Sequence, residues 1–368
     1  MECIFLPQRV MLSLLDAPQA GYPLGNLSRS EYKNMSNPIA QLDDALRATR
    51  QPFDRIPVVD IASLVNGSDA TTAAKDIRWA FANAGFMYVK NHGVSNDLIE
   101  RAYTASKLFF DLPDDVKKLL HIENSGTALR GYIPLFGENT DPTKTSDLKE
   151  CFDLGPETPG RNTPFFGSNQ WPASLPSFEA EMMAYQDAMV RLARTILRGV
   201  AISLDLPETF FEAKMRDPIS VLRLIHYPPQ SGRVAEEMIG IGAHTDYGVM
   251  TILSQDQIGG LQVMNRDGQW IEASPLEGTF VINIGDLMQI LTNDIYLANM
   301  HRVVNTSGRE RYSMPFFVEA DSDAVFEPLA SCVSATNPRK YCSATCGAHM
   351  FARYVDSFPH LQALKKSA

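Results

Sequence analysis

Apolar residues recur three and four positions apart in much of the first half of the chain. Residues 72–84 and 178–204 have this spacing, which predicts two amphipathic helices. The segment after Ser95 repeats the pattern, and serine is a residue type that caps helix N-termini. The continuous apolar run Phe86–Lys90, just before Ser95, instead predicts a buried strand.

The pattern changes after Pro207, where short apolar runs alternate with turn residues. The predicted strands of this half are Val221–Tyr227, Met250–Leu253, Gly260–Val263, Thr279–Asn283 and Ser313–Phe317. Several short strands at regular spacing are typical of a β-sandwich or barrel. We therefore expect a mixed α and β fold in which helices come first, a β-roll follows, and a helix near residues 346–356 ends the chain.

These changes divide the chain into four regions. We expect an N-terminal extension over residues 1–52, a helical and mixed region over 53–206, the β-roll over 207–322 and a C-terminal helical segment over 323–368. The extension is rich in Ser, Asn, Pro, Gln and Arg, which is typical of a flexible or surface-lying arm.

Composition narrows the class of protein. The chain has 368 residues, of which 45% are hydrophobic, so we expect a globular protein with a large core. The net charge of −10 argues against a nucleic-acid partner or an acidic membrane surface, and no apolar run approaches the roughly 18 residues of a membrane span. Five scattered cysteines argue against a disulfide framework and suit a reducing compartment, so we expect a cytoplasmic protein.

Two histidines and an aspartate form the strongest chemical motif. His244 and Asp246 are two positions apart, so in an extended backbone both side chains face the same side. His301 opens a separate apolar run that a β-roll can bring beside them. Two imidazoles and one carboxylate on one face of a metal are typical of non-haem iron(II) oxygenases. The alternative is that His244 and Asp246 cap a turn and His301 is an ordinary core histidine.

A second pair follows ten residues after His301. Arg311 and Ser313 share one face of a predicted strand by the same period-two argument. A guanidinium binds a carboxylate through two hydrogen bonds, and a serine hydroxyl adds a third donor. The pair therefore predicts a carboxylate-binding site near the metal. The alternative is a surface ion pair at the start of a strand.

Together these segments resemble the isopenicillin N synthase-like, 2-oxoglutarate- and iron(II)-dependent oxygenases, in family order and over roughly residues 55–356. The segments that carry the resemblance are Ile56–Asp60, Ala84–Gly93, Arg130–Tyr132, Lys149–Asp153, His226–Pro229, His244–Asp246, Gly259–Val263, Asn283–Asp286, His301–Val304 and Arg311–Ser313. The resemblance implies a double-stranded β-helix, or jelly-roll, core with flanking helices.

The resemblance also implies roles for individual residues. His244, Asp246 and His301 would bind iron(II), and Arg311 with Ser313 would bind 2-oxoglutarate. Tyr227 matches a tyrosine of the family that commonly joins the 2-oxoglutarate site. The implied reaction uses dioxygen to oxidise an unactivated C–H bond of a small metabolite, by hydroxylation, desaturation or ring formation, and releases succinate and carbon dioxide.

Two points stay open at this stage. Isopenicillin N synthase carries the Arg-x-Ser pair but uses no 2-oxoglutarate, so the alternative is an iron(II) oxidase in which Arg311 and Ser313 bind the carboxylate of the substrate. The substrate pocket is the second point, because ordinary core packing is an equally good explanation of its candidate residues. These candidates are Tyr132, Phe136, Phe152 and Phe317.

Overall fold

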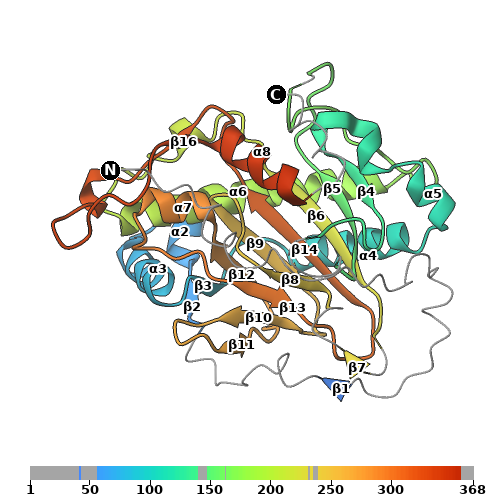
Figure 1. Cartoon of the computed structure of the whole chain (residues 1–368), viewed down its shortest axis with the longest axis horizontal. Coiled ribbons are helices and arrows are strands. Elements are labelled where there is room, and N and C mark those ends of the chain that lie inside the picture. The colour runs from blue at the N-terminus through green and yellow to red at the C-terminus, as the bar shows by residue number, and fades with distance from the viewer. Residues whose placement is uncertain are drawn as a thin grey trace, which may run out of the picture.

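The computed structural model describes residues 56–139, 147–161, 163–230 and 239–357, together with the backbone of the short parallel pair β1 (Gln41–Leu42) and β7 (Arg233–Val234). The predicted extension over residues 1–52 otherwise lies outside the described residues. Two β-sheets face each other and helices cover the outer side of the larger one, as Figure 1 shows. The expected mixed fold with a jelly-roll core is confirmed.

The larger sheet has eight strands in the order β2-β3-β12-β9-β14-β6-β5-β4. In chain order these strands are β2 (Val58–Asp60), β3 (Phe86–Lys90), β4 (Gly131–Ile133), β5 (Glu150–Leu154), β6 (Val221–Tyr227), β9 (Met250–Gln255), β12 (Thr279–Ile284) and β14 (Arg311–Val318). The smaller sheet has the order β11-β10-β13-β8. Its strands are β8 (Ile241–His244), β10 (Leu261–Met264), β11 (Trp270–Glu272) and β13 (His301–Val303), and a separate pair is β15 (Val325–Phe326) with β16 (Ala344–Thr345).

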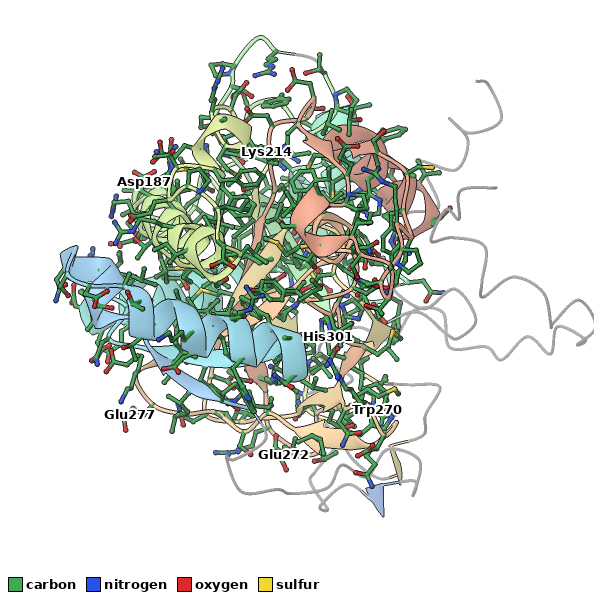
Figure 2. All side chains as sticks on the ribbon, turned by 90° about the vertical axis from the view of Figure 1, so that its left-hand side faces the viewer. Asp187, Lys214, Trp270, Glu272, Glu277 and His301 are labelled. Carbon is green, nitrogen blue, oxygen red and sulfur yellow. The ribbon has the colours of Figure 1, made fainter. Side chains whose placement is uncertain are left out.

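The helices are α2 (Ala62–Asn66), α3 (Thr71–Asn83), α4 (Asn96–Phe110), α5 (Asp114–Lys118), α6 (Phe178–Ser203), α7 (Asp286–Leu291) and α8 (Cys346–Ser357). α2 to α6 form a layer against the larger sheet, whereas α7 contacts β15 and α8 contacts β16. α6 packs against α3 and α4 and contacts β14. The methionine-rich stripe of α6, from Met182 to Val200, is buried as its helical spacing predicts. Figure 2 shows the side chains that fill the space between this layer and the sheets.

The structure bears on two expectations from composition, the absence of a membrane span and the state of the cysteines. No helix within the described ranges is long and apolar enough to cross a membrane. Cys151, Cys332 and Cys346 are free and buried, whereas Cys342 is disulfide-bonded, which the expectation of a reducing compartment did not foresee.

A buried charge cluster holds the helical layer to the larger sheet. The carboxylate of Glu150 on β5 accepts hydrogen bonds from Lys117 Nζ at 2.6 Å and from the hydroxyl of Tyr132 at 2.7 Å, and its other oxygen lies 2.7 Å from Nδ1 of His226. Burial alone would raise the pKa of Glu150, but His226 and Lys117 outweigh it and lower that pKa to about 2. The ionised carboxylate therefore contributes stability at neutral pH.

We expect Glu150→Gln to lower the free energy of unfolding by about 3 kcal/mol at pH 7, because Lys117 would stay buried with only the partly exposed Asp114 as its counter-charge. Urea denaturation measures the change, with the exposed Glu100→Gln as the control. Since the folded-state pKa is depressed, the stability difference between wild type and variant should shrink as pH falls from about 4.5 towards 2. A difference below about 0.5 kcal/mol at pH 7 would contradict this assignment.

Candidate active site

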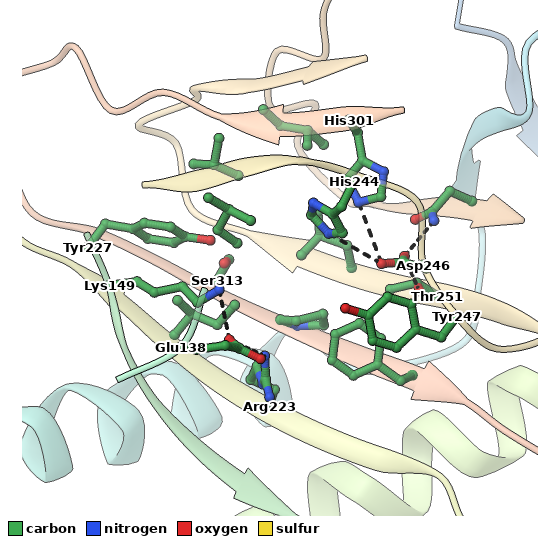
Figure 3. A pocket seen from close by; sticks show the side chains of 18 of the residues that line it. Glu138, Lys149, Arg223, Tyr227, His244, Asp246, Tyr247, Thr251, His301 and Ser313 are labelled. Atoms are coloured by element: carbon green, nitrogen blue, oxygen red, sulfur yellow. Dashed lines mark hydrogen bonds and ion pairs between the residues drawn. The ribbon is translucent and has the colours of Figure 1, made fainter. Parts of the chain in front are cut away.

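A cavity lies between the two sheets, and its lining combines apolar side chains with three groups of polar ones. His244, Asp246 and His301 form one group, and Tyr227, Arg311 and Ser313 form the second. Charged residues that include Glu138, Lys149 and Arg223 form the third, and Figure 3 shows the three groups around the same space. Met350 and Tyr354 of α8 also line the cavity, so the C-terminal helix forms part of its wall.

Strand pairing brings the two histidines together. β8 and β13 are antiparallel neighbours, and His301 is the direct cross-strand partner of His244. Asp246 follows two residues after His244, and its Oδ1 lies 3.6 Å from Nε2 of each imidazole. The three potential ligand atoms all lie within 4.8 Å of one another, so the predicted cluster forms in the structure.

Hydrogen bonds fix the orientation of both imidazoles. Nδ1 of His244 lies 2.8 Å from the carbonyl oxygen of Gly242, and Nδ1 of His301 lies 3.2 Å from that of Asn299. A proton on each Nδ1 leaves the Nε2 lone pairs directed at the centre of the cluster.

The outer carboxylate oxygen of Asp246 is held in the same way. Its Oδ2 accepts hydrogen bonds from Thr251 at 2.5 Å and from Asn283 at 2.6 Å. This arrangement leaves Oδ1 facing the imidazoles, as the dashed lines in Figure 3 show.

The electrostatics suit a cation at this point. Burial opposes ionisation of Asp246, but the two histidines hold its pKa well below the usual value. Burial and the neighbouring His301 lower the pKa of His244, whereas Asp246 raises the pKa of His301 against the effect of burial. Two nitrogen donors and one carboxylate oxygen, all on one side of a cavity, fit iron(II) and leave its other positions open. The residues present therefore fit the metal that the sequence predicts.

Arg311 is a buried cation without a carboxylate partner among the described residues. Its side chain is completely buried, its Nε donates to the carbonyl of Gly259 at 2.7 Å, and its Nη1 donates to the hydroxyl of Ser313 at 3.2 Å. Tyr227 is its cross-strand partner, and the guanidinium lies 4.6 Å from the centre of the tyrosine ring. A buried guanidinium is costly unless an anion neutralises it. The predicted carboxylate site therefore has the expected shape and charge.

The third group is a charged wall made of Glu138, Asp147, Lys149, Asp153 and Arg223. Lys149 Nζ lies 2.9 Å from both Glu138 and Asp147. Arg223 makes two hydrogen bonds to Asp153, at 2.7 and 2.8 Å, and also binds Glu138. These cations lower the pKa of Glu138 to about 2 although burial alone would raise it. Sequence reasoning assigned no role to this wall, although Lys149 and Asp153 begin and end one of the segments that carry the family resemblance.

The four predicted pocket aromatics lie in different places. Phe317 lines the cavity. Phe152 and Tyr132 are cross-strand partners on the helical side of the larger sheet, and Phe152 packs 4.4 Å from the ring of Phe109 on α4. Both belong to the core, because the period of two along β5 turns Asp153, and not Phe152, towards the cavity face of the sheet. Phe136 is half-buried and is not part of the cavity lining.

Sequence reasoning also missed Glu319. This residue follows directly after β14, is 2% exposed and lines the cavity. Its Oε2 has no hydrogen-bond partner among the described residues. A glutamate at the end of an apolar strand gives no local signal that separates a cavity position from a solvent-exposed one.

The chain is similar in sequence to known oxygenases. Residues 56–174 match the model of the N-terminal domain of non-haem dioxygenases in morphine synthesis, and residues 218–320 match the 2OG-Fe(II) oxygenase superfamily. The chain is 35% identical to the 2-oxoglutarate-Fe(II) type oxidoreductase hxnY of Emericella nidulans, over 84% of this chain and 92% of hxnY. It is 37% identical to a homoarginine-6-hydroxylase of rice, over 83% and 98% of the two chains.

A solved structure gives the same result. The fold is similar to that of a full-length Neurospora crassa protein crystallised in complex with alpha-KG and thymine, with a TM-score of 0.73 and 30% identity. The similarity covers 82% of this chain and 96% of that one.

We expect Thr251→Val to weaken iron(II) binding about 10- to 100-fold, because Asp246 would lose a hydrogen bond that directs its Oδ1 to the metal. Anaerobic competition with a coloured chelator measures the affinity, and the exposed Thr209→Val is the matched control. Unchanged iron(II) affinity in Thr251→Val would mean that this hydrogen bond does not support the cluster.

Proposed function

The chain belongs to the isopenicillin N synthase-like 2-oxoglutarate- and iron(II)-dependent oxygenases, and we propose that His244, Asp246 and His301 bind its iron and that Arg311, with Ser313 and Tyr227, binds its 2-oxoglutarate. The protein is thus a non-haem oxygenase that acts on a small molecule. The residue assignments rest on the placement of both groups around one cavity.

One observation supports the 2-oxoglutarate assignment most strongly. Arg311 is fully buried in the wall of the cavity that contains the His-Asp-His cluster, and it has no carboxylate partner among the described residues. The distal carboxylate of 2-oxoglutarate would neutralise the guanidinium and accept a further hydrogen bond from Ser313. Tyr227, buried beside both, would complete this end of the site.

Iron(II), when bound, supplies the oxidising chemistry, in which dioxygen and 2-oxoglutarate are consumed and succinate and carbon dioxide are released. The contribution of the chain is to hold and orient the reactants and to exclude water. Apolar side chains between the two polar ends, among them Phe86, Leu253 and Phe317, would keep water away from the reacting carbon.

The substrate would occupy the part of the cavity bounded by the metal cluster, the charged wall and α8. We propose a small, partly apolar metabolite that carries polar nitrogen groups and is oxidised at a C–H bond. The names of the relatives include homoarginine and thymine, which are small nitrogen-containing molecules. The charged wall offers polar partners for such groups, and Phe317 offers an apolar surface.

Production of succinate is the direct test. Protein loaded anaerobically with iron(II) and given 2-oxoglutarate, then air, should form succinate, with a rise on addition of a true substrate from a metabolite panel. His244→Ala should abolish the reaction, because the metal loses one of three ligands. Consumption of dioxygen with a substrate but without loss of 2-oxoglutarate would support the alternative, an oxidase in which Arg311 binds the carboxylate of the substrate.

Arg311→Leu tests the cosubstrate site separately. We expect the half-saturating concentration of 2-oxoglutarate to rise about 100-fold, since a charge-assisted, bidentate hydrogen bond is worth about 3 kcal/mol. Iron(II) affinity in the absence of 2-oxoglutarate should stay unchanged. Arg309→Leu, at an exposed position two residues earlier, is the matched control. A normal half-saturating concentration in Arg311→Leu would exclude this residue from the cosubstrate site.

A further inference from the structure

Glu319 is a buried carboxyl group of the cavity that neither the iron site nor the 2-oxoglutarate site uses. It is 2% exposed, it lines the cavity, and its Oε2 has no hydrogen-bond partner among the described residues. Its backbone is fixed, because its N–H donates to the hydroxyl of Ser220 at 3.0 Å and its carbonyl accepts from the same hydroxyl at 3.3 Å. A buried carboxyl group without a partner costs stability, so its presence points to a ligand.

The local structure makes room for this carboxyl group. Gly248 lies against it, and a Cβ atom at that position would come within 2.0 Å of Oε2 of Glu319. Gly248 has no positive backbone φ that would itself require glycine. Space for the Glu319 side chain is therefore the physical reason that glycine fits at this position.

Among the described residues Glu319 forms no ion pair, and Arg353 of α8 lies 3.8 Å from Asp286 instead. In the charged wall, Lys149 is paired with Glu138 and Asp147, and Arg223 is paired with Asp153 and Glu138. Three carboxylates of this wall therefore face two cations before Glu319 is counted. Arg311 lies at the 2-oxoglutarate end of the cavity and would be neutralised by that cosubstrate.

We propose that Glu319 binds a cationic nitrogen group, a guanidinium or an ammonium, on the substrate of this oxygenase and thereby selects cationic over neutral molecules. This inference rests on the proposed function, because it places the cation in the substrate part of the same cavity. An ionised carboxylate matches a guanidinium through two hydrogen bonds and an ammonium through one.

In the free protein the surroundings of Glu319 favour its protonated form. Burial, together with the charges of Asp246 and Asp286, raises the pKa of Glu319 to about 8. A bound cation would stabilise the ionised form, whereas a neutral ligand would not. A protonated Glu319 that donates to a carbonyl group is the competing interpretation, and glutamine at this position separates the two because an amide can still donate a hydrogen bond.

The test is calorimetric binding of three probes to the anaerobic complex with iron(II) and 2-oxoglutarate, so that no turnover occurs. The probes are butylguanidinium, pentylammonium and the neutral butylurea. Wild-type protein should bind at least one of the cations more tightly than butylurea. Glu319→Gln should weaken binding of that cation about 10- to 100-fold and leave butylurea unchanged, because a hydrogen bond to a charged group is lost.

Control variants separate the effect of the Glu319 charge from a change in folding. A control measurement separates it from failure of the proposed function. Glu319→Asp should keep the preference for a cation, and Asp323→Asn, which removes an exposed carboxylate nearby, should bind all probes as wild type does. Equal binding of cations and butylurea, binding of no probe, or unchanged cation binding in Glu319→Gln would overturn the inference. In each protein the affinity for 2-oxoglutarate is measured first, and its absence in wild type would contradict the proposed function and the inference with it.

Discussion

The position of one buried carboxylate determines the chemistry of the whole site. Asp246 is held through Oδ2 by Thr251 and Asn283, which come from two different strands of the larger sheet. Its Oδ1 then faces two imidazoles that the smaller sheet pairs directly across β8 and β13. The cluster therefore joins both sheets, and a change in their spacing would separate the ligand atoms. This constraint explains why these polar residues are buried between two largely apolar sheets.

The rest of the cavity follows a simple rule of charge. Buried ions are costly unless they are paired, and most ions of this cavity are paired within the protein. Lys149 and Arg223 are neutralised by the charged wall. Arg311 and Glu319 have no such counter-charge among the described residues, and they mark where ligand charges belong. Arg311 would bind a negatively charged group and Glu319 a positively charged one. One cavity could therefore hold an anionic cosubstrate and a cationic substrate at different ends at the same time.

Much of this arrangement can be predicted from the sequence, but not all of it. Period two correctly places Arg311 beside Ser313, and the change from helical to extended patterns predicts the order of helices and β-roll. The meeting of His301 with His244 depends on strand pairing between segments far apart in the chain, so the pattern allowed it and the resemblance to a family made it an expectation. Phe152 could not be assigned to the cavity or to the core, because all of β5 is buried on both faces and burial alone does not distinguish the cavity from the helical side. Glu319 gave no signal, since its importance lies in the lack of a partner in three dimensions.

The central claim is that one cavity binds iron through His244, Asp246 and His301 and binds 2-oxoglutarate through Arg311. An anaerobic crystal structure with iron(II) and 2-oxoglutarate tests it most directly. The account predicts iron on the Nε2 atoms of both histidines and Oδ1 of Asp246, with the distal carboxylate of 2-oxoglutarate on Arg311 and Ser313. Iron bound by other residues, or a 2-oxoglutarate carboxylate placed away from Arg311, would contradict it.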